Sequence, residues 1–141
     1  MASRRKAREC ALQMLFQWDM GRDSPDKVQE LFWSNTRPLE DESLHAAANE
    51  LFRGTVGAAE EIDQRIRSSA EHWRLERIAA VDRNILRLGI YELLHHRETP
   101  PPVVINEALE IARKFSEEES VQFINGLLDH IRKGVESSAP G

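Results

Sequence analysis

The chain has 141 residues, of which 40% are apolar and 30% are charged, and its net charge is −5. This length and composition predict one globular domain with its own core, and the absence of a continuous apolar run of about 18 residues excludes a transmembrane helix. The single cysteine, Cys10, excludes an internal disulfide and suits a reducing compartment, so we expect a cytoplasmic protein. Because the sequence predicts no transmembrane helix, we also expect no membrane among its partners.

Apolar residues recur at a helical period along nearly the whole chain. A first helix is predicted from the basic residues at 4–8 to Gly21, a residue that commonly ends helices. Ser24 followed by Pro25 is typical of a capped helix start, which predicts a second helix, and residues 34–42 are predicted to be a loop. The inner face of the first helix carries Ala7, Ala11, Met14, Leu15 and Trp18.

The longest predicted helix covers residues 42–70. Gly54 and Gly57 lie inside it, and each costs the helix about 1 kcal/mol relative to alanine. We therefore expect a bend or a close contact with another helix at these glycines. A short helical turn is predicted at residues 75–79.

The fifth predicted helix begins at Val81, and the prolines at 100–102 separate it from a sixth helix at about 104–115. The stretch Ser116–Glu119 has the Ser-x-x-Glu spacing of a capping box. This spacing predicts a seventh helix, which we expect to end at Gly134.

These elements predict an all-α fold of about seven helices. So many helices cannot all be neighbours in one layer, which favours two packed subbundles. We expect them to cover about 1–71 and 72–134 within a single domain at 1–134. Residues 135–141 are expected to form a disordered tail.

The sequence offers no arrangement of residues that would support catalysis. The adjacent His95 and His96 would point about 100° apart on a helix, and a single cysteine completes no metal-ligand motif. There is no glycine-rich phosphate loop, and Cys10 is better explained as a small buried residue than as a nucleophile. We therefore expect a protein that is not an enzyme and that uses neither a metal nor a cofactor.

A cluster of cations opens the chain although the whole protein is acidic. Cations at a helix N-terminus meet the positive end of the helix dipole, so helix stability alone does not explain them. An external polyanion does, and RNA or DNA is the favoured partner, with a solvated chain end and an anionic membrane surface as alternatives. The cluster consists of Arg4, Arg5, Lys6 and Arg8, followed by Glu9.

Three longer stretches resemble bacterial transcription antitermination factors of the NusB family, over about residues 4–131. The resemblance rests on four motifs in the family's order: Arg-x-x-Ala-Arg-Glu, Asp-Arg-x-Ile-Leu-Arg, Ile-Asn-Glu-Ala and Phe-Ile-Asn-Gly-x-Leu-Asp. They lie in "RRKARECALQMLFQWD", "ERIAAVDRNILRLGIYEL" and "VVINEALEIARKFSEEESVQFINGLLD".

This resemblance implies an all-α fold of two three-helix subbundles and no catalytic activity. It implies binding to boxA-type single-stranded RNA together with NusE, a ribosomal protein of the small subunit. The pair would act on the transcription elongation complex and support transcription of ribosomal RNA.

The resemblance also implies functional residues. The RNA-binding residues would be Arg4, Arg5, Lys6, Arg8, Phe115, Glu119 and Phe123. The residues facing NusE would be Phe16, Glu76 and Asp82. This chain departs from the family at two of these positions, where Phe16 replaces a frequent tyrosine and Glu119 is longer than the usual aspartate by one methylene.

Each of these assignments has a structural alternative. Aromatic residues at helical spacing are often core residues, which applies to Phe115 and Phe123. Glu119 fits a helix cap equally well, and Asp82 fits an ion-pair network within its own helix. The Asn125-Gly126 pair is interpreted as structural, with a tertiary hydrogen bond and a close helix approach.

Two other functions stay open at this point. The first is the RNA-binding module of a ribosomal RNA cytosine methyltransferase, which shares the fold and would require this chain to be a fragment. The second is an interaction protein that covers its first helix by self-association, as a homodimer that does not bind RNA.

Overall fold

The computed structural model describes residues 4–21, 23–35, 42–70 and 74–138. Within these residues all regular structure is helical, which confirms the predicted all-α fold. The described part contains no helix that is long and apolar enough to cross a membrane. The elements are α1 (Arg4–Met20), α2 (Pro25–Ser34), α3 (Glu42–Gly57), α4 (Ala59–Ser69), the 3-10 helix η1 (Leu75–Arg77), α5 (Ala80–His95), α6 (Pro101–Phe115) and α7 (Glu118–Ser138).

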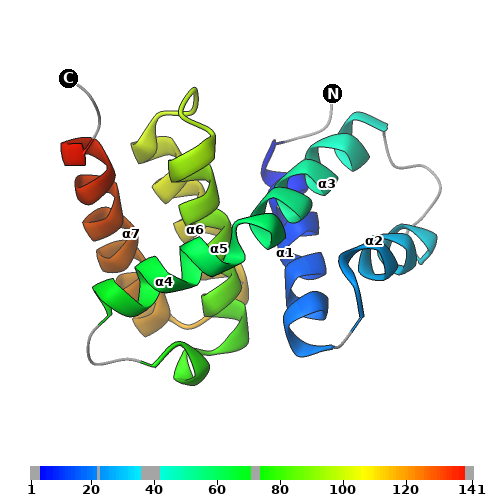
Figure 1. Cartoon of the computed structure of the whole chain (residues 1–141), viewed down its shortest axis with the longest axis horizontal. Coiled ribbons are helices and arrows are strands. Elements are labelled where there is room, and N and C mark those ends of the chain that lie inside the picture. Colours follow the sequence, from blue (N-terminus) through cyan, green and yellow to red (C-terminus); the bar gives the residue numbers. More distant parts are fainter. Residues whose placement is uncertain (1–3, 22, 36–41, 71–73, 139–141) are drawn as a thin grey trace.

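The helices form two groups of three, α1–α3 and α5–α7 (Figure 1). Helix α5 lies between the groups and packs against α1 and α3 as well as α6 and α7. Helix α4 packs mainly against α5 and α7, and so belongs with the second group. The packing therefore divides the chain at the break between α3 and α4, earlier than the predicted division near residue 72.

The predicted helix at 42–70 is two helices, interrupted at Ala58. The expected bend thus occurs directly after Gly57. The expected close contact occurs at Gly54, where a Cβ atom would overlap the ring and hydroxyl of Tyr91 on α5. The Tyr91 hydroxyl is held in place because it donates a 2.7 Å hydrogen bond to Glu50 on α3.

Replacing Gly54 with alanine is expected to lower the free energy of unfolding by about 1–3 kcal/mol, because the added methyl forces α3 away from Tyr91. Gly126 is the matched control, since it lies inside α7 and a Cβ there would meet nothing within 4 Å. Gly126→Ala should stabilise the protein by up to about 1 kcal/mol. Urea unfolding of both variants checks this, and equal midpoints would contradict it.

The predicted start of α2 is confirmed, whereas the start of α6 differs from the prediction. The Ser24 side chain accepts a hydrogen bond from the Lys27 N–H, and Pro25 is the first residue of α2, as predicted. Pro100 is the N-cap of α6, and Pro101 and Pro102 are its first two residues, at positions where a backbone N–H is not needed. The predicted loop at 34–42 has its ends within α2 and α3, and its residues 36–41 lie outside the described residues.

The two ends of α7 differ from the prediction. The capping-box pairing is replaced, because the Ser116 hydroxyl donates to Asp82 on α5. The predicted stop at Gly134 is wrong, since α7 continues to Ser138. Val135 is buried in the core at helical spacing from Ile131, which keeps this last turn packed. Residues 135–138 of the predicted tail are therefore helical, and 139–141 lie outside the described residues.

Candidate nucleic-acid interface

The cationic cluster at the start of α1 is divided by burial. Arg4, Arg5 and Lys6 are exposed, whereas Arg8 is only 4% exposed. The Arg8 guanidinium forms two hydrogen bonds with Glu92 on α5, from Nε to Oε2 at 2.8 Å and from Nη2 to Oε1 at 2.9 Å. The prediction that Arg8 contacts RNA phosphate is therefore wrong, because both sides of the pair are buried between α1 and α5.

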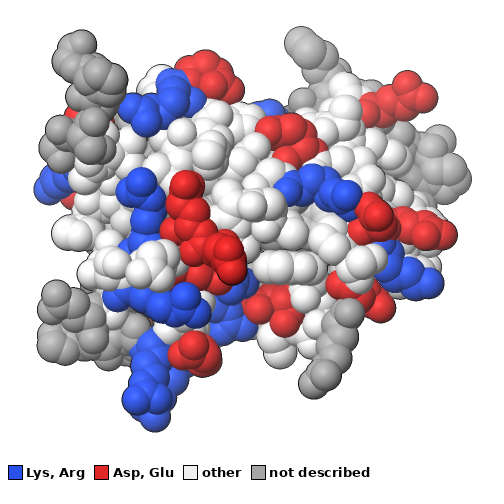
Figure 2. All heavy atoms as spheres, viewed as in Figure 1, with Lys and Arg blue, Asp and Glu red and all other residues white. Residues whose placement is uncertain are grey.

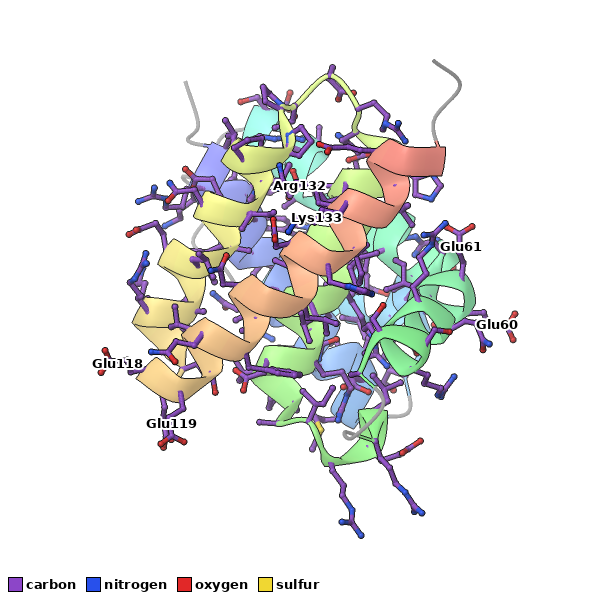
Figure 3. The ribbon with its side chains drawn as sticks, turned by 90° about the vertical axis from the view of Figure 1, so that its left-hand side faces the viewer. Glu60, Glu61, Glu118, Glu119, Arg132 and Lys133 are labelled. Atoms are coloured by element: carbon purple, nitrogen blue, oxygen red, sulfur yellow. The ribbon has the colours of Figure 1, made fainter. Side chains whose placement is uncertain are left out.

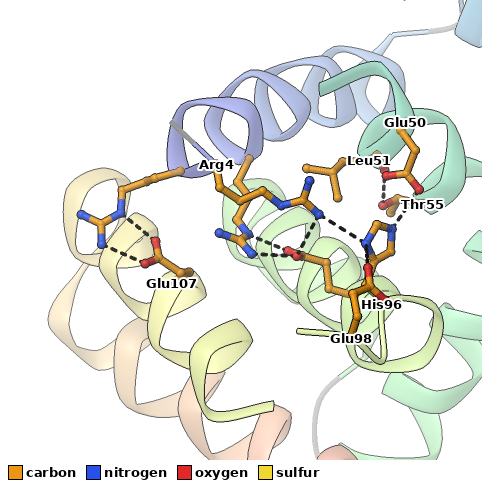
Figure 4. A network of polar contacts seen from close by, with 10 residues as sticks. Arg4, Glu50, Leu51, Thr55, His96, Glu98 and Glu107 are labelled. Atoms are coloured by element: carbon orange, nitrogen blue, oxygen red, sulfur yellow. Dashed lines mark hydrogen bonds and ion pairs between the residues drawn. The ribbon is translucent and has the colours of Figure 1, made fainter. Parts of the chain in front are cut away.

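Arg4 extends over the end of α5 (Figure 4). Its Nη2 atom lies 3.3 Å from His96 Nδ1 and 4.0 Å from Glu92 Oε1. The other imidazole nitrogen, His96 Nε2, lies 2.8 Å from Glu50 on α3. Arg4 is therefore oriented by α5 but remains about half exposed and accessible to an external anion.

A row of ion pairs connects α1 to α6. Arg5 donates to both carboxylate oxygens of Glu107, at 2.7 and 3.1 Å, and Lys114 donates to Glu9 at 2.8 Å. The hydrogen bond from Arg5 holds the pKa of Glu107 below its usual value. The Arg5 side chain is about half exposed, so the pair adds little stability and can be shared with a phosphate.

An apolar cleft of about 310 Å³ lies at the other end of α1. Phe16 and Phe115 are exposed by 38% and 44%, so the core alternative for Phe115 is wrong. The sequence assigned Phe16 to a protein partner and Phe115 to RNA, yet both line this one cleft. Its lining residues are Leu12, Gln13, Phe16, Gln17, Val81 and Phe115.

A second cleft, of about 250 Å³, lies between η1 and α7. Phe123 is half-buried against the core, and Glu119 is exposed on the first turn of α7. The cleft also contains Arg77, which the sequence analysis did not identify because an isolated arginine beside Glu76 carries no motif. The lining residues are Arg77, Ile78, Ala79, Asp82, Glu119, Ser120 and Phe123.

Asp82 is not available to a protein partner. It is buried, and its two carboxylate oxygens accept hydrogen bonds from the hydroxyls of Ser116 and Ser120. The prediction that Asp82 faces NusE is therefore wrong, because the first turn of α5 packs against the turn between α6 and α7. Glu76, the neighbouring acidic candidate on η1, is exposed.

The alternative of an ion-pair network within α5 is also wrong. Arg83 donates two hydrogen bonds to Asp19 on α1, and Arg87 pairs with Asp63 on α4. Burial alone would raise the pKa of Asp19, but hydrogen bonds from Arg83 and Asn84 and the charge of Arg87 hold the pKa below its usual value. This network joins the two helix groups rather than presenting a partner surface.

Asn125 and Gly126 lie on the exposed face of α7. A Cβ at Gly126 would meet nothing within 4 Å, so no other helix among the described residues approaches there. The interpretation of this pair as a tertiary packing site is therefore wrong.

The predicted RNA-binding residues thus lie in two places. The exposed cations Arg4, Arg5 and Lys6 lie at the start of α1, whereas Phe115, Glu119 and Phe123 lie around the turn between α6 and α7. Phe16, which lines the same cleft as Phe115, is eleven residues after Arg5 on α1, which is about 16 Å along a helix axis. The surface charges are mixed, with basic and acidic side chains side by side on the face in Figure 2.

No cluster of three or more metal-ligating residues occurs in the described part of the chain.

Comparisons with known proteins identify one family. A sequence model of the NusB family matches residues 5–133. The transcription antitermination protein NusB of Koribacter versatilis is 54% identical over 135 residues, covering 96% of this chain and 92% of that protein. The corresponding protein of Solibacter usitatus is 50% identical over 145 residues, covering 99% and 96%.

Solved structures agree with these sequence matches. NusB of T. maritima superimposes with a TM-score of 0.84 at 36% identity, covering 94% of this chain and 92% of that chain. A chain from a crystal structure of the antitermination factors NusB and NusE in complex with dsRNA superimposes with a TM-score of 0.83 at 28% identity. That match covers 93% of this chain and 96% of the other.

Proposed function

This chain belongs to the NusB family, and from this membership we propose that it is a non-enzymatic, RNA-binding transcription antitermination factor that acts together with NusE. Its preferred RNA in this proposal is boxA-type single-stranded RNA. The complex acts in the cytoplasm on the transcription elongation complex and supports transcription of ribosomal RNA.

The observation that carries this proposal is the arrangement of exposed groups along α1. Arg4, Arg5 and Lys6 provide positive charge for phosphates at its start. The apolar cleft with Phe16 and Phe115 at its other end suits a protein partner, because exposed aromatic side chains in a cleft are typical anchors of protein interfaces.

We place NusE on the cleft with Phe16 and Phe115, and RNA on the cationic start of α1 and on the cleft with Glu119 and Phe123. Phe115 then lies near the boundary between NusE and RNA, since it lines the first cleft and is four residues before Glu119, which lines the second. Binding of both partners would be cooperative because each holds the other close to its own site.

Replacing Arg4, Arg5 and Lys6 together with alanine is expected to flatten the salt dependence of RNA binding. Each lost contact with a single-strand phosphate removes about 0.7 from the slope of log K against log salt, so the three remove about 2. The measurement is a titration of boxA-like and scrambled RNA, with and without NusE, over a range of salt concentrations.

A charge-matched control replaces three exposed cations that lie outside the cationic start of α1 and outside both clefts. They are Lys27, Arg65 and Arg67. This variant has the same net charge and should keep the wild-type slope. An equal change of slope in both variants would contradict a specific phosphate site at the start of α1.

A further inference from the structure

His96, the residue directly after α5, lies among charged side chains from three parts of the chain (Figure 4). Its Nε2 atom lies 2.8 Å from Glu50 on α3. Its Nδ1 atom lies 3.3 Å from Arg4 Nη2 on α1 and 3.2 Å from Glu98 Oε1. The imidazole is only 13% exposed, so these side chains are its main polar neighbours.

The Nε2 side of the ring is fixed as a hydrogen-bond donor. A carboxylate only accepts hydrogen bonds, so Nε2 donates to Glu50 whether His96 is neutral or charged. The same Glu50 oxygen also accepts from the Tyr91 hydroxyl at 2.7 Å. Burial, and then the hydrogen bond to Glu50, raise the pKa of Tyr91, which keeps this hydroxyl a donor. In neutral His96 the proton is therefore on Nε2, and Nδ1 carries none.

The Nδ1 atom consequently has two partners that exclude each other. Without a proton, Nδ1 accepts a hydrogen bond from Arg4, which can only donate, and it has nothing to donate to Glu98. With a proton, Nδ1 donates to Glu98 and can no longer accept from Arg4. The new positive charge on the ring then also repels the guanidinium beside it.

We propose that His96 is a pH-sensitive switch on Arg4: neutral His96 holds the guanidinium against the end of α5, and charged His96 releases it to an external phosphate. Glu92 also lies near this contact, 4.0 Å from Arg4, but its two oxygens already accept hydrogen bonds from Arg8. Histidine changes its charge between about pH 5 and 8, so the switch operates near neutral pH.

The direction of the effect follows from the charges. A fall in pH frees one cation for RNA, so RNA binding becomes tighter in acid. By linkage, RNA binding favours uptake of a proton by His96 to the same extent. This inference rests on the proposed RNA-binding function and adds a regulation to it.

The neighbouring histidine is a matched control. His95 is 46% exposed, and its Nε2 atom lies 3.4 Å from Glu61 on α4. Figure 3 shows Glu61 at the edge of the helix bundle. Adjacent residues point about 100° apart on a helix, so His95 can change its charge without acting on Arg4.

The test measures the affinity for a boxA-like RNA at about pH 8 and about pH 6 at constant salt. The wild type should bind about fivefold more tightly at the lower pH, which is the size of one charge contact in water. His96→Gln should remove this difference because glutamine stays neutral, whereas His95→Gln should keep it. Arg4→Gln should remove it too. A pH effect that persists in Arg4→Gln would overturn the proposal, since His96 would then not act through Arg4.

Nuclear magnetic resonance of the free protein tests the switch without RNA. The ring nitrogens of His96 should carry a proton on Nε2 alone at about pH 8 and on both atoms at about pH 6. The Arg4 guanidinium should be ordered only at the higher pH, and identical Arg4 signals at both pH values would overturn the switch. If the wild type binds no RNA at either pH, the proposed function fails, and the Arg4 signals still decide whether His96 controls this side chain.

Discussion

Replacing Arg8 with alanine is expected to lower the free energy of unfolding by about 3–5 kcal/mol, because it leaves the carboxylate of Glu92 buried without its partner. Arg5→Ala is the matched control on the same helix. Its partner Glu107 is reached by a half-exposed side chain, so the loss should be much smaller than for Arg8→Ala. Urea unfolding of the two variants measures both values.

Replacing both members of the buried pair separates its structural role from an RNA contact. Arg8→Met combined with Glu92→Leu should recover most of the lost stability, because apolar residues of similar size avoid a buried unpaired charge. The double variant should also bind RNA with nearly the wild-type salt slope. A variant that is stable but loses about 0.7 of the slope would contradict the assignment of Arg8 as structural.

Replacing Phe16 with alanine is expected to weaken binding of NusE by at least about 2 kcal/mol, which is about 30-fold in Kd. The ring lies in the cleft with Phe115 and is 38% exposed, so its removal takes an anchor from the interface while the core stays intact. Isothermal titration calorimetry with NusE measures the Kd, and thermal unfolding checks that the fold is unchanged.

Met20→Ala is the control for Phe16. Met20 is 61% exposed on the same helix, but it does not line the cleft. Its replacement should leave the Kd for NusE within about twofold of the wild type, as expected for a residue outside the centre of an interface. Equal losses for Phe16→Ala and Met20→Ala would place NusE elsewhere.

Much of the fold could be predicted from the sequence because its signals are local. The period of apolar residues identified the helical segments, and Ser24 with Pro25 identified the start of α2. Gly54 and Gly57 indicated the interruption between α3 and α4, although not that it separates two helices. The stop expected at Gly134 failed because burial of Val135 offsets the cost of one glycine.

The candidate site was predicted less completely. The family motifs led to the surface that carries Phe16, Phe115, Glu119 and Phe123, and the structure exposes three of these and half-buries Phe123. Arg77 was missed, since only the tertiary structure brings η1 beside α7 and forms their common cleft.

By itself, the sequence determined that this chain is all-α, belongs to the NusB family and carries cations at its start. Only the tertiary structure decided which charges are free. Arg8 lies at helical spacing with Ala11, Leu12 and Leu15, so its position on the inner face could be predicted. Its partner Glu92 could not, because it lies 84 residues away in the sequence. A charged side chain at an inner position is buried only where the fold supplies an opposite charge, and for Arg8 and Asp19 remote parts of the chain supply it.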